Sequence, residues 1–418
     1  MKLQDFGVNR FEGKLMNGVR VVLFQKQGAP IFIRAVFKAG SRYDQKGQEG
    51  AAHFLEHLMS NGRKVFSSKD LLAEYIESVG GTYGMATNRE LLWVNTEIAD
   101  KTDIDHAVKV LDATMCDPEF DSHDIEKERQ VILTELKRDE NNQRLVLINT
   151  VLSDAFAGSP FEHRVLGTIE ALQDMPFDAL IKLKQQRITS ACVTFIVSGD
   201  IELPLLVEKL EGLTILSENK STIDSAHSFT LPASIDTKKH VSFPSEQTFM
   251  YYGFPGAEQF TKDSLCLGLV TSIMAGGRAS RLAKVLRYEK GLVYSVSPQT
   301  YTNTHSSILG VITDTPTEKV PEVVESITGA FELLRKDGVT QNELDFAKNK
   351  RIKSLKSTMQ TSESWVDFHY YGECMNPKEY LPLDKFIETI SSITLQDIHQ
   401  AIHTYLLPEH VILVTCGK

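Results

Sequence analysis

Short apolar runs rich in β-branched and aromatic residues predict the strands of this chain. Residues 18–24 and 30–37 are two such runs, and a Gly-Ala-Pro break at 28–30 separates them, so we predict an antiparallel pair of strands. Residues 91–98 and 193–200 have the same character and are predicted as two further strands.

Longer runs of good helix formers predict the helices. Residues 51–59, 104–115 and 121–139 are such runs, and in the last of them apolar residues are available for packing. Residues 67–80 predict a further helix, because Ser67 or Ser68 can cap its start and Gly80-Gly81 can end it.

The order of elements repeats after a polar segment in the middle of the chain. Residues 216–228 lack periodicity, so we predict a linker at 216–236 between two halves at 1–215 and 237–418. A repeat of about 200 residues indicates an old duplication. The matching pairs are 248–254 with the strand 30–37, 265–274 with the helix 51–59, 317–335 with the helix 104–115, and 410–418 with the strand 193–200.

Composition and charge exclude several classes of protein. A chain of 418 residues is too long for one ordinary core, and 42% hydrophobic with 24% charged residues is typical of a globular protein. The net charge of −10 argues against non-specific nucleic-acid binding. We find no apolar run of membrane-spanning length and no signal peptide, so we expect a cytoplasmic protein without a membrane segment. Five widely spaced cysteines predict buried thiols in a reducing compartment.

Two histidines and a glutamate share one face of the helix predicted at 51–59. His53, Glu56 and His57 have the spacing i, i+3, i+4, which places them together on a helix. Two imidazoles one turn apart can bind one zinc ion, and Glu56 then remains free to transfer protons. The pattern H-x-x-E-H is the inverted form of the H-E-x-x-H zinc motif. The alternative interpretation is a pair of surface histidines that happen to lie near a glutamate.

A catalytic zinc site needs a third protein ligand, and the helix predicted at 121–139 offers one. Glu128 and Glu135 lie seven residues apart on one face of that helix, which is two turns. Glu135 is the candidate third ligand for one zinc ion per chain. Glu128 is the candidate partner that orients a ligating imidazole. The alternative is that both are solvated charges on an acidic helix.

The arrangement of these residues resembles the pitrilysin and insulinase family of zinc peptidases, which includes the mitochondrial processing peptidase. The family carries the same inverted pentapeptide, then a glutamate ligand roughly 70–80 residues later, and a second glutamate seven positions before that ligand. Here Glu135 follows His57 by 78 residues. The match covers essentially the whole chain and looks like the shorter, bacterial-type members. It implies zinc-dependent endopeptidase activity and an α+β fold of two homologous halves, each a mostly antiparallel sheet covered by helices.

The second half contains a pair of residues that the same resemblance identifies as substrate-binding. Arg287 and Tyr294 are seven residues apart, like the arginine and tyrosine of the family in the half that lacks zinc. A guanidinium and a phenol supply donors for the negative charge that develops on a peptide carbonyl. The alternative is a surface ion-pair arginine and a tyrosine in a core strand.

These residues together predict a mechanism of peptide hydrolysis. With zinc held by His53, His57 and Glu135, the pKa of a zinc-bound water falls to about 7. Glu56 takes a proton from that water and delivers it to the leaving amine, while Tyr294 shares the oxyanion charge with the metal. The peptide is expected to bind extended, along a strand edge near the zinc helix.

Two further positions remain open. The family commonly carries a substrate-contacting asparagine before the late strand of the first half, but this chain has Gly84 there, and Asn88 follows four residues later as a weak candidate. The loop 161–168 resembles a family loop near the active site, so His163 either touches the site or has only a structural role.

The resemblance also implies that two chains meet. We expect a homodimer, or a heterodimer with a related chain, acting on peptides. One alternative function is a non-catalytic peptide-binding or scaffold subunit of a processing-peptidase-like complex, which the complete zinc motif argues against. Another is a zinc enzyme acting on a non-peptide substrate, which the Arg287–Tyr294 pair argues against.

Overall fold

The computed structural model describes residues 2–62, 65–115, 122–216 and 237–418, which form two compact units. Unit 1 comprises the described residues within Met1–Leu136, His163–Ala226 and Leu355–Asp384. Unit 2 comprises those within Lys137–Glu162, His227–Ser354 and Lys385–Lys418. Residues 217–236, which include all but the first residue of the predicted linker, lie outside the described residues.

Unit 1 is built on a six-stranded, mostly antiparallel sheet in which only β2 and β6 pair in parallel. The strand order is β1-β2-β6-β3-β5-β4. The bounds are β1 Val8–Lys14, β2 Arg20–Lys26, β3 Ile31–Phe37, β4 Thr82–Thr87, β5 Leu92–Ile98 and β6 Val193–Gly199.

The prediction that the strands at 18–24 and 30–37 pair with each other was wrong, because β6 lies between β2 and β3. All residues of β3 and nearly all of β6 are buried, and a central position in the sheet is where both faces of a strand can be covered. The turn between β2 and β3 closes over the end of β6, where the carboxylate of Asp200 accepts a hydrogen bond from the Gly28 amide at 2.9 Å.

The helices of unit 1 agree with the predicted ones where a prediction was made. Ser68 caps the helix α2 by accepting a hydrogen bond from the amide of Leu71 at 3.3 Å. The helices are α1 Ala51–Met59, α2 Lys69–Glu77, α3 Ile104–Met115, α4 Ser122–Glu140, α6 Ile169–Asp174, α7 Phe177–Arg187, α8 Leu203–Leu210 and α12 Ser362–Met375, with 3-10 turns at Leu3–Phe6, Ser41–Tyr43, Lys101–Asp103 and Thr214–Leu216.

Unit 2 contains a five-stranded sheet with the order β7-β11-β8-β10-β9, and only β7 and β11 pair in parallel. The strands are β7 Thr237–Ser242, β8 Gln247–Gly256, β9 Val296–Thr302, β10 Ser307–Pro316 and β11 Ile412–Gly417. The helices are α5 Gln143–Ala155, α9 Lys262–Ala275, α10 Val320–Asp337, α11 Gln341–Thr358, α13 Leu383–Ser392 and α14 Leu395–Tyr405, with a π-helical segment at Ala283–Glu289 and 3-10 turns at Thr317–Lys319 and Pro408–His410.

The two sheets confirm the predicted α+β repeat. The order β2-β6-β3-β5-β4 in unit 1 corresponds strand for strand to β7-β11-β8-β10-β9 in unit 2, with the same parallel pair at the same place. As predicted, β8 matches β3, and β11 matches β6. The helices α9 and α10 likewise match α1 and α3, because each follows the corresponding strand.

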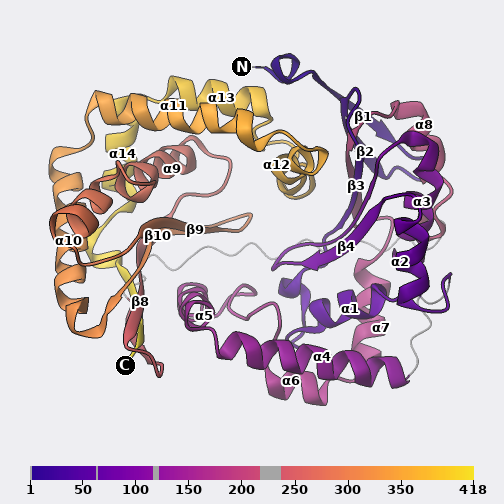
Figure 1. Ribbon diagram of the computed structural model, residues 1–418, viewed down its shortest axis with the longest axis horizontal. Helices are drawn as coiled ribbons and strands as arrows, with labels where there is room; N and C mark the ends of the chain where they lie inside the picture. The colour runs from indigo at the N-terminus through magenta and orange to yellow at the C-terminus, as the bar shows by residue number, and fades with distance from the viewer. Residues whose placement is uncertain (1, 63–64, 116–121, 217–236) are drawn as a thin grey trace. The chain divides into compact units, whose positions relative to one another are not determined.

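The compact units differ from the continuous halves 1–215 and 237–418 because two helices are exchanged. Helix α12 of the second half belongs to unit 1, and helix α5 of the first half belongs to unit 2. Helix α12, from the second half, covers one face of the unit 1 sheet, where His369 stacks on Phe24 with ring centroids 4.2 Å apart. Helix α5, from the first half, packs on the unit 2 sheet through Leu147 and Val151. Figure 1 shows α5 and α10 on opposite sides of β8 and β10. Each central strand is apolar on both faces, so each sheet needs a helix on both sides.

Two remaining expectations concern thiols and membranes. Cys192, Cys266, Cys374 and Cys416 are free and buried, as predicted, while Cys116 lies outside the described residues. Within the described parts of the chain, none of the helices combines the length and the apolar character that crossing a bilayer requires.

Candidate metal centre

The loop that follows β3 positions the start of α1. Within this loop, Arg42 forms a buried ion pair with Glu90 at 2.8 Å. The carboxylate of Asp44 then accepts hydrogen bonds from the backbone amides of Gly50 at 2.8 Å and Ala52 at 2.9 Å. These amides belong to the first turn of α1, whose N–H groups have no partner within the helix. Asp44 therefore fixes where the helix begins.

Two glycines hold a second loop against the same helix end. Gly50 has φ +98° and Gly167 has φ +76°, both in the left-handed region that favours glycine. A Cβ atom on Gly50 would lie 2.7 Å from the carbonyl oxygen of Leu166, and one on Gly167 would overlap the carbonyl of Glu49. The main chains at 49–50 and 166–167 therefore touch, and the loop around residues 161–168 is anchored to the start of α1.

We expect Gly167→Ala to lower the free energy of unfolding by about 2–4 kcal/mol, because it adds left-handed strain to a backbone clash. Gly158→Ala is the matched control: Gly158 has φ +74°, but a Cβ there meets nothing within 4 Å. The control is expected to cost only about 1 kcal/mol. Urea denaturation followed by circular dichroism measures both, and equal losses would show that the backbone contact is unimportant.

The structure brings His53, His57 and Glu135 together. The Nε2 atoms of His53 and His57 each lie 3.8 Å from the same carboxylate oxygen of Glu135, and ligand atoms of all three residues lie within 4.8 Å of one another. A tetrahedral zinc ion with ligands at about 2.0–2.1 Å separates neighbouring ligand atoms by about 3.4 Å. The observed separations are too long for hydrogen bonds and close to what a shared ion requires.

The protonation states suit a metal. Burial, reinforced by the neighbouring His57, lowers the pKa of His53 to about 4, so its imidazole is neutral at pH 7 and has a free lone pair. The Nδ1 atom of His53 is buried and has no hydrogen-bond partner among the described residues. Nδ1 of His57 lies 3.1 Å from a carboxylate oxygen of Glu128, and this hydrogen bond lowers the pKa of Glu128. With Nδ1–H donating to Glu128, Nε2 of His57 is left available for an ion.

Glu56 lies on the same face of α1 and interacts with the edge strand β4. The hydroxyl of Thr87 donates a hydrogen bond to its carboxylate at 2.7 Å. Burial raises the pKa of Glu56, and the negative charge of Glu135 acts in the same direction. A half-buried carboxylate that is held by one donor and whose pKa is raised is suited to accept a proton.

The sequence did not reveal Thr87 or Asp44. Neither lies at a motif spacing from His53 or Glu56, and each reaches α1 only through the fold. A weak signal was available for Asp44, since an acidic residue shortly before a helix is a common cap.

The other residues that the sequence analysis considered for this site are Asn88, Gly84 and His163. The Asn88 side chain accepts hydrogen bonds from the amides of Glu90 and Leu91, both at 2.8 Å, and so stabilises the turn between β4 and β5. A Cβ on Gly84 would meet nothing within 4 Å. His163 is half exposed, with Nε2 3.9 Å from a carboxylate oxygen of Glu49, and it is not a member of the His53–His57–Glu135 group.

Arg287 and Tyr294 lie together in unit 2. Arg287 belongs to the π-helical segment Ala283–Glu289, and its guanidinium carbon is 5.0 Å from the centre of the Tyr294 ring. Tyr294 precedes β9 and is 79% exposed, so it is not a core strand residue. Both side chains are available to a ligand of unit 2.

The sequence matches two family models and is similar to several named proteins. Residues 20–169 match the family model described as insulinase, peptidase family M16, and residues 174–351 match the model described as peptidase M16 inactive domain. An uncharacterized zinc protease of Bacillus subtilis is 24% identical over 92% of each chain. A Helicobacter pylori protein named as a non-peptidase homolog is also 24% identical, over 90% of this chain and 86% of its own.

Solved structures show the same fold. A protease from Helicobacter pylori has a TM-score of 0.91 at 18% identity, covering 98% of this chain and 100% of its own. A chain of complex III from Candida albicans has a TM-score of 0.83 at 15% identity, covering 97% of this chain and 95% of its own.

Proposed function

Because the chain belongs to peptidase family M16, the insulinase family, we propose that it is a zinc-dependent endopeptidase that hydrolyses peptides or small unfolded proteins. The observation that carries the proposal is the group formed by His53, His57 and Glu135, with Glu56 on the same helix face. Two imidazoles and one carboxylate are a usual set of protein ligands for a catalytic zinc ion.

The ligand roles follow from the contacts. His53 and His57 would hold zinc through nitrogen, and Glu135 would hold it through a carboxylate oxygen. Glu128 keeps the His57 ring oriented through the hydrogen bond to Nδ1. When bound, zinc acts as a Lewis acid that polarises a carbonyl and lowers the pKa of water.

The proton transfers belong to Glu56. Its carboxylate accepts a proton from the water that attacks the scissile carbonyl, and it then donates this proton to the nitrogen of the leaving amine. The Thr87 hydroxyl holds one oxygen of Glu56 in place. The other oxygen remains available to the water.

The substrate would bind as an extended strand. β4 is an edge strand of its sheet and carries Thr87 beside Glu56, so its free edge runs up to the proposed proton acceptor. Backbone pairing with an edge strand reads main-chain groups rather than side chains. Arg287 and Tyr294 would donate hydrogen bonds to carbonyl oxygens of a bound peptide.

A second candidate function is a non-catalytic peptide-binding or scaffold subunit. One relative is named as a non-peptidase homolog, and a chain of complex III has the same fold. The presence of the complete group His53, His57, Glu135 and Glu56 favours the enzyme for this chain.

Zinc content and peptide cleavage together test the proposal. We expect about one zinc ion per chain, and cleavage of an internally quenched peptide library that a chelator abolishes and added zinc restores. Chelator-sensitive zinc without any cleavage would point to a zinc enzyme acting on another substrate. A chain that neither retains zinc nor cleaves would be the scaffold.

We further propose a homodimer as the working assembly, with a heterodimer of related chains as the alternative. A self-complementary interface with two-fold symmetry would give two equal sites. Light scattering of the purified chain measures the mass, and a monomer at micromolar concentration would contradict the homodimer.

A further inference from the structure

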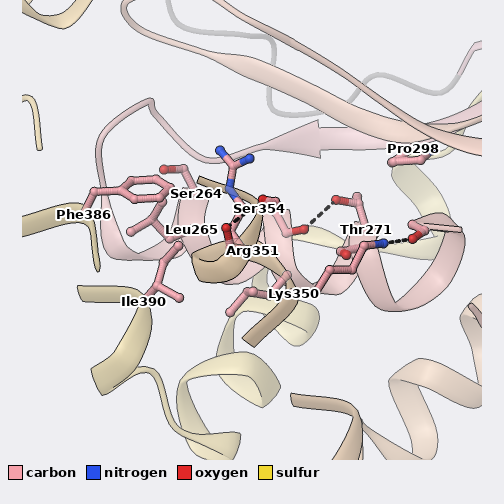
Figure 2. A pocket seen from close by; sticks show the side chains of 13 residues that line it. Ser264, Leu265, Thr271, Pro298, Lys350, Arg351, Ser354, Phe386 and Ile390 are labelled. Atoms are coloured by element: carbon pink, nitrogen blue, oxygen red, sulfur yellow. Dashed lines mark hydrogen bonds between the residues drawn. The ribbon is translucent and has the colours of Figure 1, made fainter. Parts of the chain in front are cut away.

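Unit 2 contains a cavity of about 520 Å³ beside α9, between this helix, α11 and α13. Figure 2 shows the side chains that line it, with the guanidinium of Arg351 near Ser264. All of its lining residues belong to unit 2.

The cavity lies beside α9, the helix of unit 2 that corresponds to α1, which carries His53 and His57 in unit 1. Gly62 and Gly277 both have left-handed φ angles, +56° and +118°, just beyond α1 and α9. His53 and Gly268 lie the same number of residues before Gly62 and Gly277, respectively. By the same count, Glu56 corresponds to Thr271 and His57 to Ser272. Gly268, Thr271 and Ser272 all line the cavity.

The second ligand-bearing helix shows the same correspondence. Glu135 on α4 precedes the first residue of α5 by eight positions, and Ser354 on α11 precedes the first residue of α12 by eight. Ser354 also lines the cavity. By these counts, the positions of the metal group and of Glu56 correspond in unit 2 to residues that are glycine or carry a hydroxyl group. This exchange leaves room for a ligand.

The charge in the cavity is positive. Among the described residues that line it, Lys350 and Arg351 are cations and none is a carboxylate, in a chain with a net charge of −10. Lys350 donates a hydrogen bond to the carbonyl of Gly276. No ion pair or hydrogen bond of the Arg351 guanidinium is present within the described residues, and its recorded contact is with the ring of Phe386 at 5.3 Å. Arg351 is exposed, so its guanidinium is accessible to an anionic ligand.

Another part of the lining is apolar. Leu265, Leu269, Phe386 and Ile390 form this apolar wall, and the guanidinium of Arg351 lies over the ring of Phe386. A cavity lined by both cationic and apolar side chains matches a ligand that carries a negative charge on an apolar group.

We propose that this cavity binds the C-terminal residue of a peptide, with Arg351 contacting the terminal carboxylate and the apolar wall contacting an aliphatic or aromatic side chain. The choice of a peptide rests on the proposed endopeptidase function, whereas the choice of a carboxylate on an apolar group rests on the cavity alone. A planar guanidinium can bind a carboxylate through two parallel hydrogen bonds.

The space around the cavity favours a chain over a small free acid. A second cavity of about 360 Å³ shares Ser272, Gly276 and Lys350 with the first. It offers a path for the residues that precede the terminal one. A single small carboxylic acid would leave most of both cavities to water.

The test uses the full chain with Glu56→Gln, so that the probe is not cleaved. The probe is a fluorescein-labelled hexapeptide that ends in leucine, compared with the same peptide as a C-terminal amide, and fluorescence anisotropy gives both dissociation constants. We expect the amide to bind about 10–100-fold more weakly, because it lacks the charge that faces Arg351. Equal affinities, or no binding of either peptide, would overturn the proposal.

Arg351→Gln should weaken binding of the free-acid peptide to the level of the amide and remove the preference. Lys353→Gln is the matched control, because it makes the same charge change at an exposed position of α11 outside the cavity, and it should leave the preference intact. Since Arg351 lacks an ion pair in the described chain, its replacement breaks no salt bridge of the fold. An acid preference that persists in Arg351→Gln would refute its role.

Gly268→Leu tests the cavity itself. A Cβ on Gly268 meets nothing within 4 Å, so a leucine side chain can project into the space and should abolish the acid preference while the chain stays folded. Gly268→Ala should bind the peptide with unchanged affinity. Its Tm should rise measurably, because alanine is a better helix former than glycine. Unchanged binding in Gly268→Leu would place the peptide elsewhere.

N-acetyl-leucine distinguishes the two sources of the carboxylate. If it competes as tightly as the unlabelled hexapeptide, the ligand is a small free acid and the peptide assignment fails. A peptide that binds at least 10-fold more tightly supports it. Peptide cleavage is measured separately with unsubstituted protein, so loss of the proposed activity and loss of this binding site are independent outcomes.

Discussion

Glu56→Gln is expected to lower kcat for peptide cleavage by about 10²–10⁴-fold while zinc stays bound, because the amide cannot accept a proton from water. Glutamine keeps the size of the side chain and can still accept the hydrogen bond that Thr87 donates at 2.7 Å. Neither His53, His57 nor Glu135 is altered. Zinc is measured by elemental analysis of the purified variant, and kcat by the release of fluorescence from a quenched peptide.

Glu74→Gln is the matched control for this substitution. Glu74 is exposed on α2, and we expect both zinc content and kcat of the variant to be unchanged. Should Glu56→Gln cleave peptides at a near-normal rate, Glu56 would not be the general base, although the metal centre would stand.

The second large effect concerns zinc affinity. A loss of roughly 10–100-fold in zinc affinity is typical when the replaced residue contacts a metal ligand but not the metal. Glu135→Gln should lower the affinity for zinc by more than this. The reason is that Glu135 supplies the oxygen that lies 3.8 Å from both histidine nitrogens. Glu128→Gln should fall within that 10–100-fold range, because Glu128 contacts His57 and does not belong to the group itself.

Competition with a fluorescent zinc chelator measures both dissociation constants. Glu126→Gln provides the comparison on the same helix: Glu126 is exposed and pairs with Arg129 and Gln130, so its loss should leave zinc affinity as it was. If Glu135→Gln binds zinc as tightly as Glu128→Gln, the third ligand lies elsewhere.

Local patterns were sufficient for the elements that carry the metal group. The spacing of His53, Glu56 and His57 predicts a shared face on any helix, and the helices at 51–59 and 104–115 appear with the predicted bounds. Glu135 had a weaker basis, since its distance from His57 was recognisable only through a family resemblance. The structure then places all three ligand candidates in one group.

Strand pairing was not predictable from local patterns. The residues of β2 and β3 mark two strands, but nothing in them shows that β6, from far along the chain, lies between them. The same holds for α5 and α12, because each comes from one half of the sequence and covers the sheet built from the other half. Pairing and packing of this kind depend on which apolar faces remain to be covered once the whole chain has folded.

The sequence by itself determined that two imidazoles and a carboxylate share one turn of a helix, that a second helix offers Glu128 and Glu135, and that the chain is a duplication of which one copy lost its histidines. The shared helix faces are short-range properties, because helical periodicity sets them within a few residues, whereas the duplication is read from the repeated order of elements. Only the tertiary structure decided that Asp44 accepts hydrogen bonds from the start of that helix, that Thr87 contacts Glu56, and that a cavity lined by Lys350 and Arg351 lies beside α9. Such contacts join residues that are distant in sequence, and the packing of the sheets and helices sets them rather than any spacing along the chain.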